Sequence, residues 1–129
     1  MQTEDLPIDN IQVSIQTQYL SDQSEPEQER FVFAYTVTIA NKSNQPAQLI
    51  SRHWIITDGH DQVQEVQGIG VVGQQPRLDP GASYTYTSGV VLPTGMGTMT
   101  GTYQMRLDNG DEFDASIPEF VLIHPKSLH

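Results

Sequence analysis

The sequence predicts an all-β fold, either a β-sandwich or a small β-barrel, and two observations carry this prediction. Apolar and polar residues alternate along several short stretches, which is typical of strands with one buried face. Glycine, proline, asparagine and aspartate separate these stretches at intervals of about eight to twelve residues. The chain has 129 residues, which suits a single domain.

The strands follow from the local patterns in chain order. Residues 11–15 alternate strictly, and residues 31–39 carry aromatic and β-branched side chains at every second position. Asparagine and serine at 41–44 supply a turn before the next strand. Together with the patterns further along, strands are predicted at residues 11–15, 31–39, 49–57, 62–66, 84–92, 99–107, 112–115 and 120–124.

Several local signals set the connections between these strands. Asp58-Gly59 and Asn109-Gly110 predict hairpin turns, because both dipeptides favour tight reversals. Gly89 predicts a bulge, and Pro118 predicts a break between the last two strands, at a sheet edge or a strand start. Residues 24–30 have the spacing of a helix capping box, which predicts at most one or two helical turns.

Composition excludes several classes of function. The chain has 16 acidic and 6 basic residues, a formal net charge of −10, and no cysteine. Such a charge repels phosphate backbones, so no nucleic-acid binding is expected, and disulfides and thiolate sites are excluded. The first ten residues are polar and acidic, and no apolar stretch is long enough to span a membrane. The sequence therefore predicts a soluble, cytoplasmic protein without a membrane partner.

The stretch GIGVVG contains Gly68, Gly70 and Gly73 with the G-x-G-x-x-G spacing of dinucleotide-binding loops. In those loops a strand precedes the glycines and a helix follows, so that the helix N-terminus holds the pyrophosphate. Here the residues that follow do not favour a helix. The prediction is a glycine-rich β segment or bulge, in which a nest of backbone N–H groups remains able to hold an anion.

Two arginines are candidates to assist such an anion. Arg52 and Trp54 are expected on one face of their strand, and His53 on the other. Trp54, the only tryptophan, is predicted in the core. Arg52 has two interpretations, an ion pair with an acidic residue or a fork that binds phosphate or carboxylate. Arg77 follows the glycine segment and is the second candidate phosphate ligand.

The turn with Asp58, His60 and Asp61 offers two carboxylates and an imidazole to a divalent metal ion. The same residues are ordinary for an exposed hairpin tip, so the turn is the preferred interpretation and the metal candidates are weak. No bound cofactor is predicted.

No catalytic constellation is found. Ser88 lacks the glycines of a nucleophile elbow, and the four histidines are scattered. Met96, Met99 and Met105, with Tyr103, are expected to fill the core. The sequence therefore predicts a protein that is not an enzyme.

Seven stretches together resemble the ApaG family, which is also called CorD in some bacteria. They are YTVTIAN, LISRHWIITD, VQGIGVVGQQP, LDPG, YTSG, GTMTGTYQM and IPEFVL, and they extend across the chain in the family's order. The resemblance implies one ApaG domain over residues 1–129, with its core at about 11–125. It also implies an immunoglobulin-like or fibronectin type III-like β-sandwich of about seven to nine strands.

What the resemblance implies about function is less specific. The family is associated with cobalt resistance, magnesium efflux and the operon of a diadenosine tetraphosphate hydrolase, and related modules occur in eukaryotic proteins that bind other proteins. A non-enzymatic module that binds an unknown protein partner is therefore the first hypothesis. The alternative is a sensor of ATP or diadenosine tetraphosphate that binds pyrophosphate, with or without a divalent metal.

Overall fold

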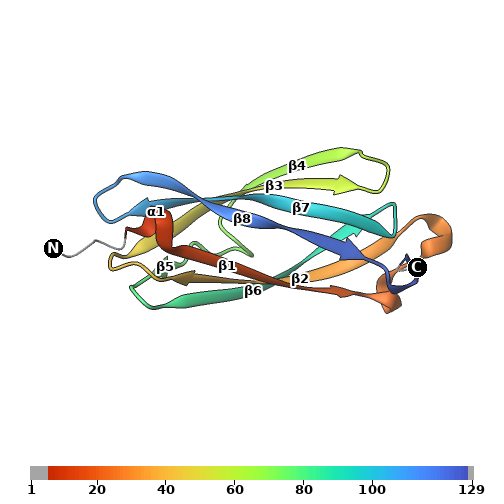
Figure 1. The fold of residues 1–129 in the computed structure, drawn as a ribbon, viewed down its shortest axis with the longest axis horizontal. Coiled ribbons are helices and arrows are strands. Elements are labelled where there is room, and N and C mark those ends of the chain that lie inside the picture. Colours follow the sequence, from red (N-terminus) through yellow and green to blue (C-terminus); the bar gives the residue numbers. More distant parts are fainter. Residues whose placement is uncertain (1–5, 128–129) are drawn as a thin grey trace.

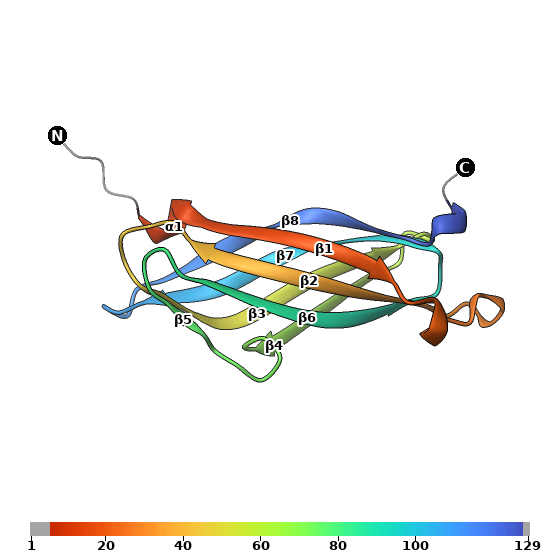
Figure 2. The same ribbon diagram turned by 90° about the horizontal axis from the view of Figure 1, so that it is seen from below.

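The computed structural model describes residues 6–127, and it consists of two antiparallel β-sheets packed face to face (Figures 1 and 2). The predicted β-sandwich is confirmed, with its eight strands within the expected range. The strands are β1 (Ile11–Tyr19), β2 (Phe31–Asn41), β3 (Ala47–Asp58), β4 (Val63–Ile69), β5 (Arg77–Leu78), β6 (Ser83–Leu92), β7 (Met96–Leu107) and β8 (Glu112–Ile123). No helix within residues 6–127 is long and apolar enough to cross a membrane.

The smaller sheet has the strand order β1-β2-β6, and the larger has the order β4-β3-β7-β8, with the short β5 paired to one end of β3. The remaining elements are single turns, and they lie at the two ends of the strands (Figure 1). They are α1 (Pro7–Asn10), η1 (Ser21–Gln23), η2 (Pro26–Gln28) and η3 (Pro125–Ser127). Each sheet thus ends in two edge strands, and the four edges define the two long sides of the sandwich.

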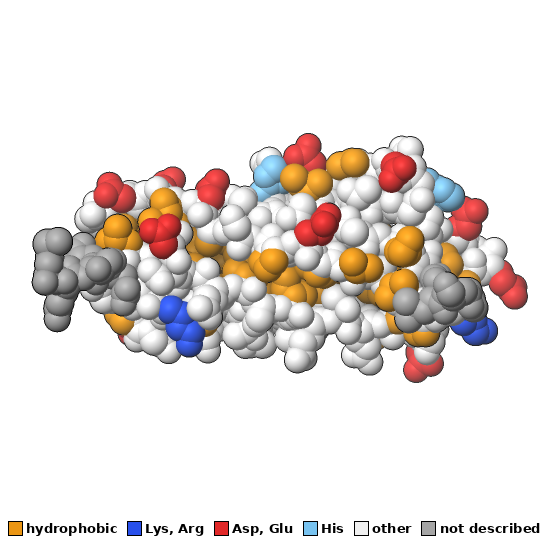
Figure 3. Space-filling model, in the orientation of Figure 1, with side chains coloured by type: hydrophobic (Ala, Val, Ile, Leu, Met, Phe, Trp, Pro, Cys, Tyr) orange, Lys and Arg blue, Asp and Glu red, His pale blue; other side chains and the backbone are white. Residues whose placement is uncertain are grey.

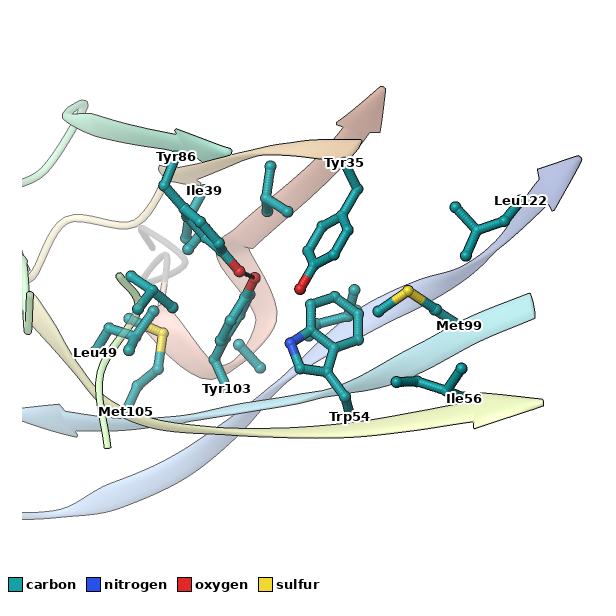
Figure 4. Packing of buried hydrophobic residues seen from close by; sticks show 14 of the residues in the cluster. Tyr35, Ile39, Leu49, Trp54, Ile56, Tyr86, Met99, Tyr103, Met105 and Leu122 are labelled. Carbon is teal, nitrogen blue, oxygen red and sulfur yellow. Dashed lines mark hydrogen bonds between the residues drawn. The ribbon is translucent and has the colours of Figure 1, made fainter. Parts of the chain in front are cut away.

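The core lies between the sheets and is centred on aromatic side chains (Figure 4). Trp54 is 2% exposed, as predicted, and packs edge-on against Tyr35 with ring centroids 5.4 Å apart. Met99, Met105 and Tyr103 are buried, as predicted. Met96 is 48% exposed, so its predicted place in the core is wrong. It begins β7, opposite Ile123 at the end of β8.

Three sequence predictions about local structure are corrected. The register between β2 and β6 runs without a shift through Gly89, so there is no bulge there. Residues 112–123 form one strand instead of two. Pro118 lies inside it, where Pro118 and Glu119 together stand opposite Thr100 of β7. A bulge on an edge strand tolerates proline because no ladder N–H is needed, and the edge position itself was predicted.

The third correction concerns residues 24–30. They contain the 3₁₀ turn η2 but no capping box, since the Ser24 hydroxyl is engaged with other parts of the chain. It donates to the Leu20 carbonyl at 2.8 Å and accepts from the Val32 amide at 2.8 Å. The serine therefore ties the connection to the start of β2 instead of starting a helix.

The turn after β2 is organised by the buried side chain of Asn41. Its amide nitrogen donates to the carbonyls of Gln45 and Leu78, at 2.8 and 3.0 Å. Its carbonyl oxygen accepts from the Ser43 amide at 3.0 Å and from the Ser43 hydroxyl at 2.6 Å. The polar atoms of this fully buried side chain are thus satisfied, which fixes the path from β2 to β3.

Candidate functional site

The glycine segment closes as a tight hairpin and not as a helix-capped loop. Val71 and Gln74 exchange two backbone hydrogen bonds, 2.8 and 2.9 Å long. Val72 and Gly73 between them have φ of 48° and 78°, as a type I′ turn requires. The predicted β segment is observed, and no helix follows it.

Each of the three glycines has a local structural reason. A Cβ on Gly68 would lie 2.7 Å from Nη1 of Arg52, so the guanidinium occupies the space over this residue. Gly70 has φ of 66°, and a Cβ there would lie 2.4 Å from the Gln74 carbonyl oxygen. Gly73 supplies the second left-handed residue of the turn. The spacing of the three glycines is therefore explained without a nucleotide.

The amides that a phosphate nest would use are largely engaged inside the protein. The Gly70 amide donates to the Ile50 carbonyl at 2.8 Å, and the Val71 and Gln74 amides are used in the turn. This leaves the amides of Val72 and Gly73 at the exposed tip. Anion binding at this segment stays a prediction, and it would depend on these two amides and on neighbouring cations.

Arg52 is held beside the glycine segment by backbone carbonyls. Its Nη1 donates to the Gly70 carbonyl at 2.8 Å and to the Ile69 carbonyl at 3.2 Å. Within residues 6–127 no carboxylate lies within ion-pair distance of Arg52, so the ion-pair interpretation is wrong. The guanidinium therefore keeps an uncompensated positive charge.

Arg77, the second predicted phosphate ligand, is differently placed. Its guanidinium makes two hydrogen bonds to the Asp108 carboxylate, at 2.7 and 3.2 Å, and one to Asp79 at 2.6 Å. The Asp108 hydrogen bond and charge raise the pKa of Arg77, and Arg77 lowers the pKa of Asp108. Two carboxylates thus already compensate this arginine, whereas none compensates Arg52.

The metal candidates Asp58, His60 and Asp61 form the β3–β4 hairpin tip, where the predicted reversal is confirmed. The Asp58 carboxylate accepts the amides of His60 and Gln62, at 2.8 and 3.1 Å, and Asp61 has φ of 61°. Asp58 therefore caps the turn through its Oδ1. Across the described part of the chain, no three histidine, aspartate or glutamate side chains converge as metal ligands would.

Behind Arg52, between the edge strands β4 and β6, the core opens into a cleft of 280 Å³, called here the β4–β6 cleft. Its lining mixes apolar and polar side chains. The lining residues are Tyr35, Arg52, Trp54, Ile56, Gln64, Val66, Ser88, Gly89, Val90, Val91 and Met99. Sequence reasoning found Arg52 and Trp54 but missed the cleft, since it depends on which strands meet across the two sheets.

Polar groups also lie beside Tyr35 and Trp54, two residues that line this cleft. Trp54 Nε1 is buried and has no hydrogen-bond partner among the described residues. Figure 4 shows that this nitrogen lies on the side of the indole toward the hydroxyls of Tyr35, Tyr86 and Tyr103. The hydroxyls of Tyr86 and Tyr103 are hydrogen-bonded to each other.

Burial dominates the ionisation of these two phenols. It raises the pKa of Tyr86 to about 12, and it raises the pKa of Tyr103 further, because a buried phenolate has lost its hydration. The positive charge of Arg52 opposes both shifts without cancelling them. At neutral pH both phenols are therefore protonated and act as hydrogen-bond donors.

The opposite side of the sandwich carries a groove of 640 Å³, called here the β1–β8 groove. It is lined by Ile11, Gln12, Val13, Ser14, Ala40, Lys42, Ser116 and Pro118. In Figure 3 a band of apolar side chains runs lengthwise along this side, between the strands that Figure 1 labels β1 and β8. The groove was not predicted, although the alternation in residues 11–15 was its sequence signal.

The backbone of β1 has one side without a strand partner. The Lys42 amide bonds to the Asn10 carbonyl and the Leu20 amide to the Val32 carbonyl, both at 2.8 Å and both in the β1–β2 register. Hydrogen-bonded pairs alternate in an antiparallel ladder, so even-numbered residues of β1 bond to β2. The N–H and C=O groups of Ile11, Val13 and Ile15 therefore point away from β2, toward the groove.

The described residues thus define an all-β protein of the two-sheet sandwich class, with a polar cleft on one side and an apolar groove on the other. The family model of the ApaG domain matches residues 21–107. The chain belongs to the ApaG family, as the resemblance of its motifs predicted.

Relatives agree along nearly the whole chain. A protein of Dechloromonas aromatica (strain RCB), named Protein ApaG, is 58% identical over 119 residues, which is 92% of this chain and 94% of the relative. A Protein ApaG of Pseudomonas aeruginosa (strain LESB58) is 59% identical over the same length and shares. A crystal structure of a Bordetella pertussis protein described as ApaA superposes with a TM-score of 0.88 at 55% identity, over 91% of this chain and 95% of that one.

Proposed function

We propose that this protein is a non-enzymatic protein-interaction module that binds an extended, basic segment of a partner protein along β1. The observation that carries the proposal is the free backbone edge of β1 beside the apolar groove. An extended segment that adds to such an edge gains main-chain hydrogen bonds, and its alternate side chains enter the groove.

The sequence of β1 does not protect this edge. Its nine residues, IQVSIQTQY, contain neither a charged residue nor a proline. Edge strands that avoid pairing usually carry lysine, proline or a bulge. The facing strand β8 carries such features, since Pro118 and the bulge interrupt its free edge. Only the β1 edge of this groove therefore offers continuous pairing.

Charge favours a basic partner segment. The exposed side chains of Asp114 and Glu119 lie on β8, and Lys42 is the only cation among the groove-lining residues. The chain as a whole carries −10. Lysine or arginine between the apolar positions of the partner would thus speed association and fix its orientation, and added salt would weaken binding.

The test is a titration of the ¹⁵N-labelled protein with two soluble peptides of nine residues, the length of β1. Both have the same valine and threonine residues at alternate positions, one with lysine between them and the other with glutamate. We expect the lysine peptide to shift the amide signals of Ile11, Val13 and Ile15 and to slow their hydrogen exchange. The glutamate peptide should do neither.

Substitutions at one groove position provide matched variants. Ser14 lines the groove and is exposed. Its backbone bonds to β2, so its replacement leaves the free edge intact. Ser14→Lys should weaken binding of the lysine peptide and Ser14→Asp should strengthen it, each by about threefold. Thr85→Lys, on the exposed face of β6, is the control. Amide shifts confined to β4 or β6, or equal responses to both peptides, would contradict the proposal.

A second candidate function is a sensor of ATP or diadenosine tetraphosphate at the glycine segment. The observation that favours it is the uncompensated charge of Arg52 beside Gly68 and Gly70. The exposed amides of Val72 and Gly73 would supply the remaining donors. The acidic surface and the internal use of the other amides rank it below the interaction module.

A titration with each nucleotide, with and without Mg²⁺ or Co²⁺, tests this candidate. Saturable shifts at Val72 and Gly73 that Arg52→Gln removes would support it. No shift there at millimolar nucleotide, under any metal condition, would end it.

A further inference from the structure

Hydrogen-bond donors lie in and next to the β4–β6 cleft, since Arg52 and Trp54 line it and the Tyr86–Tyr103 pair packs beside Trp54. Trp54 Nε1–H is buried without a partner in the described part of the chain. Such a group costs free energy unless something outside the chain accepts its hydrogen. The Tyr86–Tyr103 pair uses one hydroxyl hydrogen and leaves the other to donate. Trp54 Nε1–H therefore still lacks an acceptor.

Arg52 is prepared to bind an acceptor with two oxygens. Only its Nη1 bonds to the glycine segment, and Nε and Nη2 make no hydrogen bond within residues 6–127. These two nitrogens form one side of the guanidinium fork, which matches the two oxygens of a carboxylate. The backbone contacts hold the fork in place before any ligand arrives, which lowers the entropic cost of binding.

The size of the cleft and the polarity of its lining limit which ligands fit. No acidic side chain lines it, so nothing in the lining repels an anion. The side chains of Ile56, Val66, Val90 and Met99 add apolar surface beside the polar side chains. A volume of 280 Å³ admits a small molecule and not a nucleotide with several phosphates.

We propose that the β4–β6 cleft binds a small organic carboxylate, with its oxygens on Arg52 and Trp54 Nε1 and its apolar body against Val66 and Val90. This site is independent of the β1–β8 groove, so its failure and the failure of the interaction module are separate results. It requires no metal and no chemistry on the ligand.

The single tryptophan makes the test direct, because the ¹⁵N-labelled protein gives one indole N–H signal. The probes are phenylacetate and hexanoate, the neutral amides of the same two acids, and inorganic phosphate. We expect a saturable downfield shift of the indole signal with the two carboxylates, as a charge-assisted hydrogen bond forms. The amides should bind at least tenfold more weakly, and phosphate should not move the signal.

Three variants separate the cleft from its surroundings. Arg52→Gln should weaken carboxylate binding at least tenfold, as measured by the shift of the indole signal. Trp54→Phe keeps an aromatic ring but removes the N–H, and it should weaken binding to a similar extent. Because this variant has no indole signal, binding is measured from the amide signals of Val66 and Val90. Arg77→Gln removes a cation outside the cleft, so the dissociation constant should not change. Circular dichroism confirms that each variant is folded.

Two results would overturn the proposal. If no carboxylate at tens of millimolar shifts the indole signal, water and not a carboxylate accepts the hydrogen of Trp54 Nε1. Equal affinity for the carboxylates and their amides, or unchanged affinity in Trp54→Phe, would show that the ligand does not use the donors described.

Discussion

The two long sides of the sandwich are built from edge strands in the same way, yet they differ in what they present. On one side β8 has twelve residues and turns Ala115, Ile117 and Leu122 into the core, each nearly or fully buried. On the other side β4 has seven residues and turns Gln64, Val66 and Gly68 inward. The β1–β8 groove is consequently apolar, and the β4–β6 cleft reaches polar groups.

This difference shows how one fold acquires two kinds of surface. The inward residues of the edge strands decide which side chains of the central strands stay accessible, such as Arg52 on β3. Because Gly68 has no side chain, the Arg52 guanidinium has room beside β4. A long edge with apolar inward residues presents an apolar surface, and a short one with polar or missing side chains leaves polar groups within reach.

The largest expected difference is in stability. Leu122 is fully buried on β8, so Leu122→Ala should lower the free energy of unfolding by about 3 kcal/mol. Val66 on β4 is only partly buried, and Val66→Ala should cost about 1 kcal/mol. Urea unfolding of both variants measures these values. Equal costs would show that the two sides are packed alike.

The second prediction uses high pH, which acts on the cleft side through the tyrosines. The pKa of Tyr86 is raised to about 12 in the folded state, while the unfolded value is about 10. Above pH 10 the unfolded chain therefore loses a proton that the folded chain keeps, and stability falls as the pH rises. For Tyr86 alone the loss at pH 11 should be roughly 1 to 2 kcal/mol.

Tyr86→Phe provides the control, because it removes this ionisation and keeps the ring. The variant should lose less stability between pH 10 and 11 than the parent does, measured by urea unfolding at each pH. Parallel curves for the two proteins would contradict the assignment of this loss to the buried phenol.

The third prediction tests how Gly68 and Arg52 depend on each other. Gly68→Ala places a methyl group against the guanidinium and should destabilise the protein by about 1 to 2 kcal/mol. In an Arg52→Ala background the same methyl group meets empty space, and the cost should fall below about 0.5 kcal/mol. A double-mutant cycle by urea unfolding gives the coupling energy. Additive effects would mean that the glycine serves another purpose.

The smallest expected effect is at the tip of the glycine turn. Val72 is β-branched and has φ of 48°, a conformation that asparagine adopts more readily. Val72→Asn should therefore raise the free energy of unfolding by about 1 kcal/mol. Thermal unfolding measures it, with Val91→Asn on the exposed part of β6 as the control. A lower melting temperature for Val72→Asn would show that the valine side chain makes a stabilising contact there.

Much of the fold was predictable from the sequence, and the reasons are local. Alternation in residues 11–15 and 31–39, and the turn signals Asp58-Gly59 and Asn109-Gly110, located strands and hairpins because side-chain period and turn geometry act within a few residues. Pro118 misled the prediction, since its bulge depends on the partner strand β7.

The candidate sites were less predictable because they depend on contacts across the sandwich. Arg52 and the glycines were identified from the sequence, but the predicted link between them was a phosphate, whereas the guanidinium itself covers Gly68. Tyr86 on β6 and Tyr103 on β7 belong to different sheets, and their hydroxyls meet only where the two sheets face each other. No short sequence pattern contains that information.

One NMR experiment tests the central claim that the two sides bind different partners. The lysine peptide and phenylacetate are added in turn to the same ¹⁵N-labelled sample. We predict that the peptide shifts the amides of Ile11, Val13 and Ile15 and leaves the Trp54 indole signal in place, and that phenylacetate does the reverse. Overlapping responses, or no response of the indole signal to phenylacetate, would contradict the account.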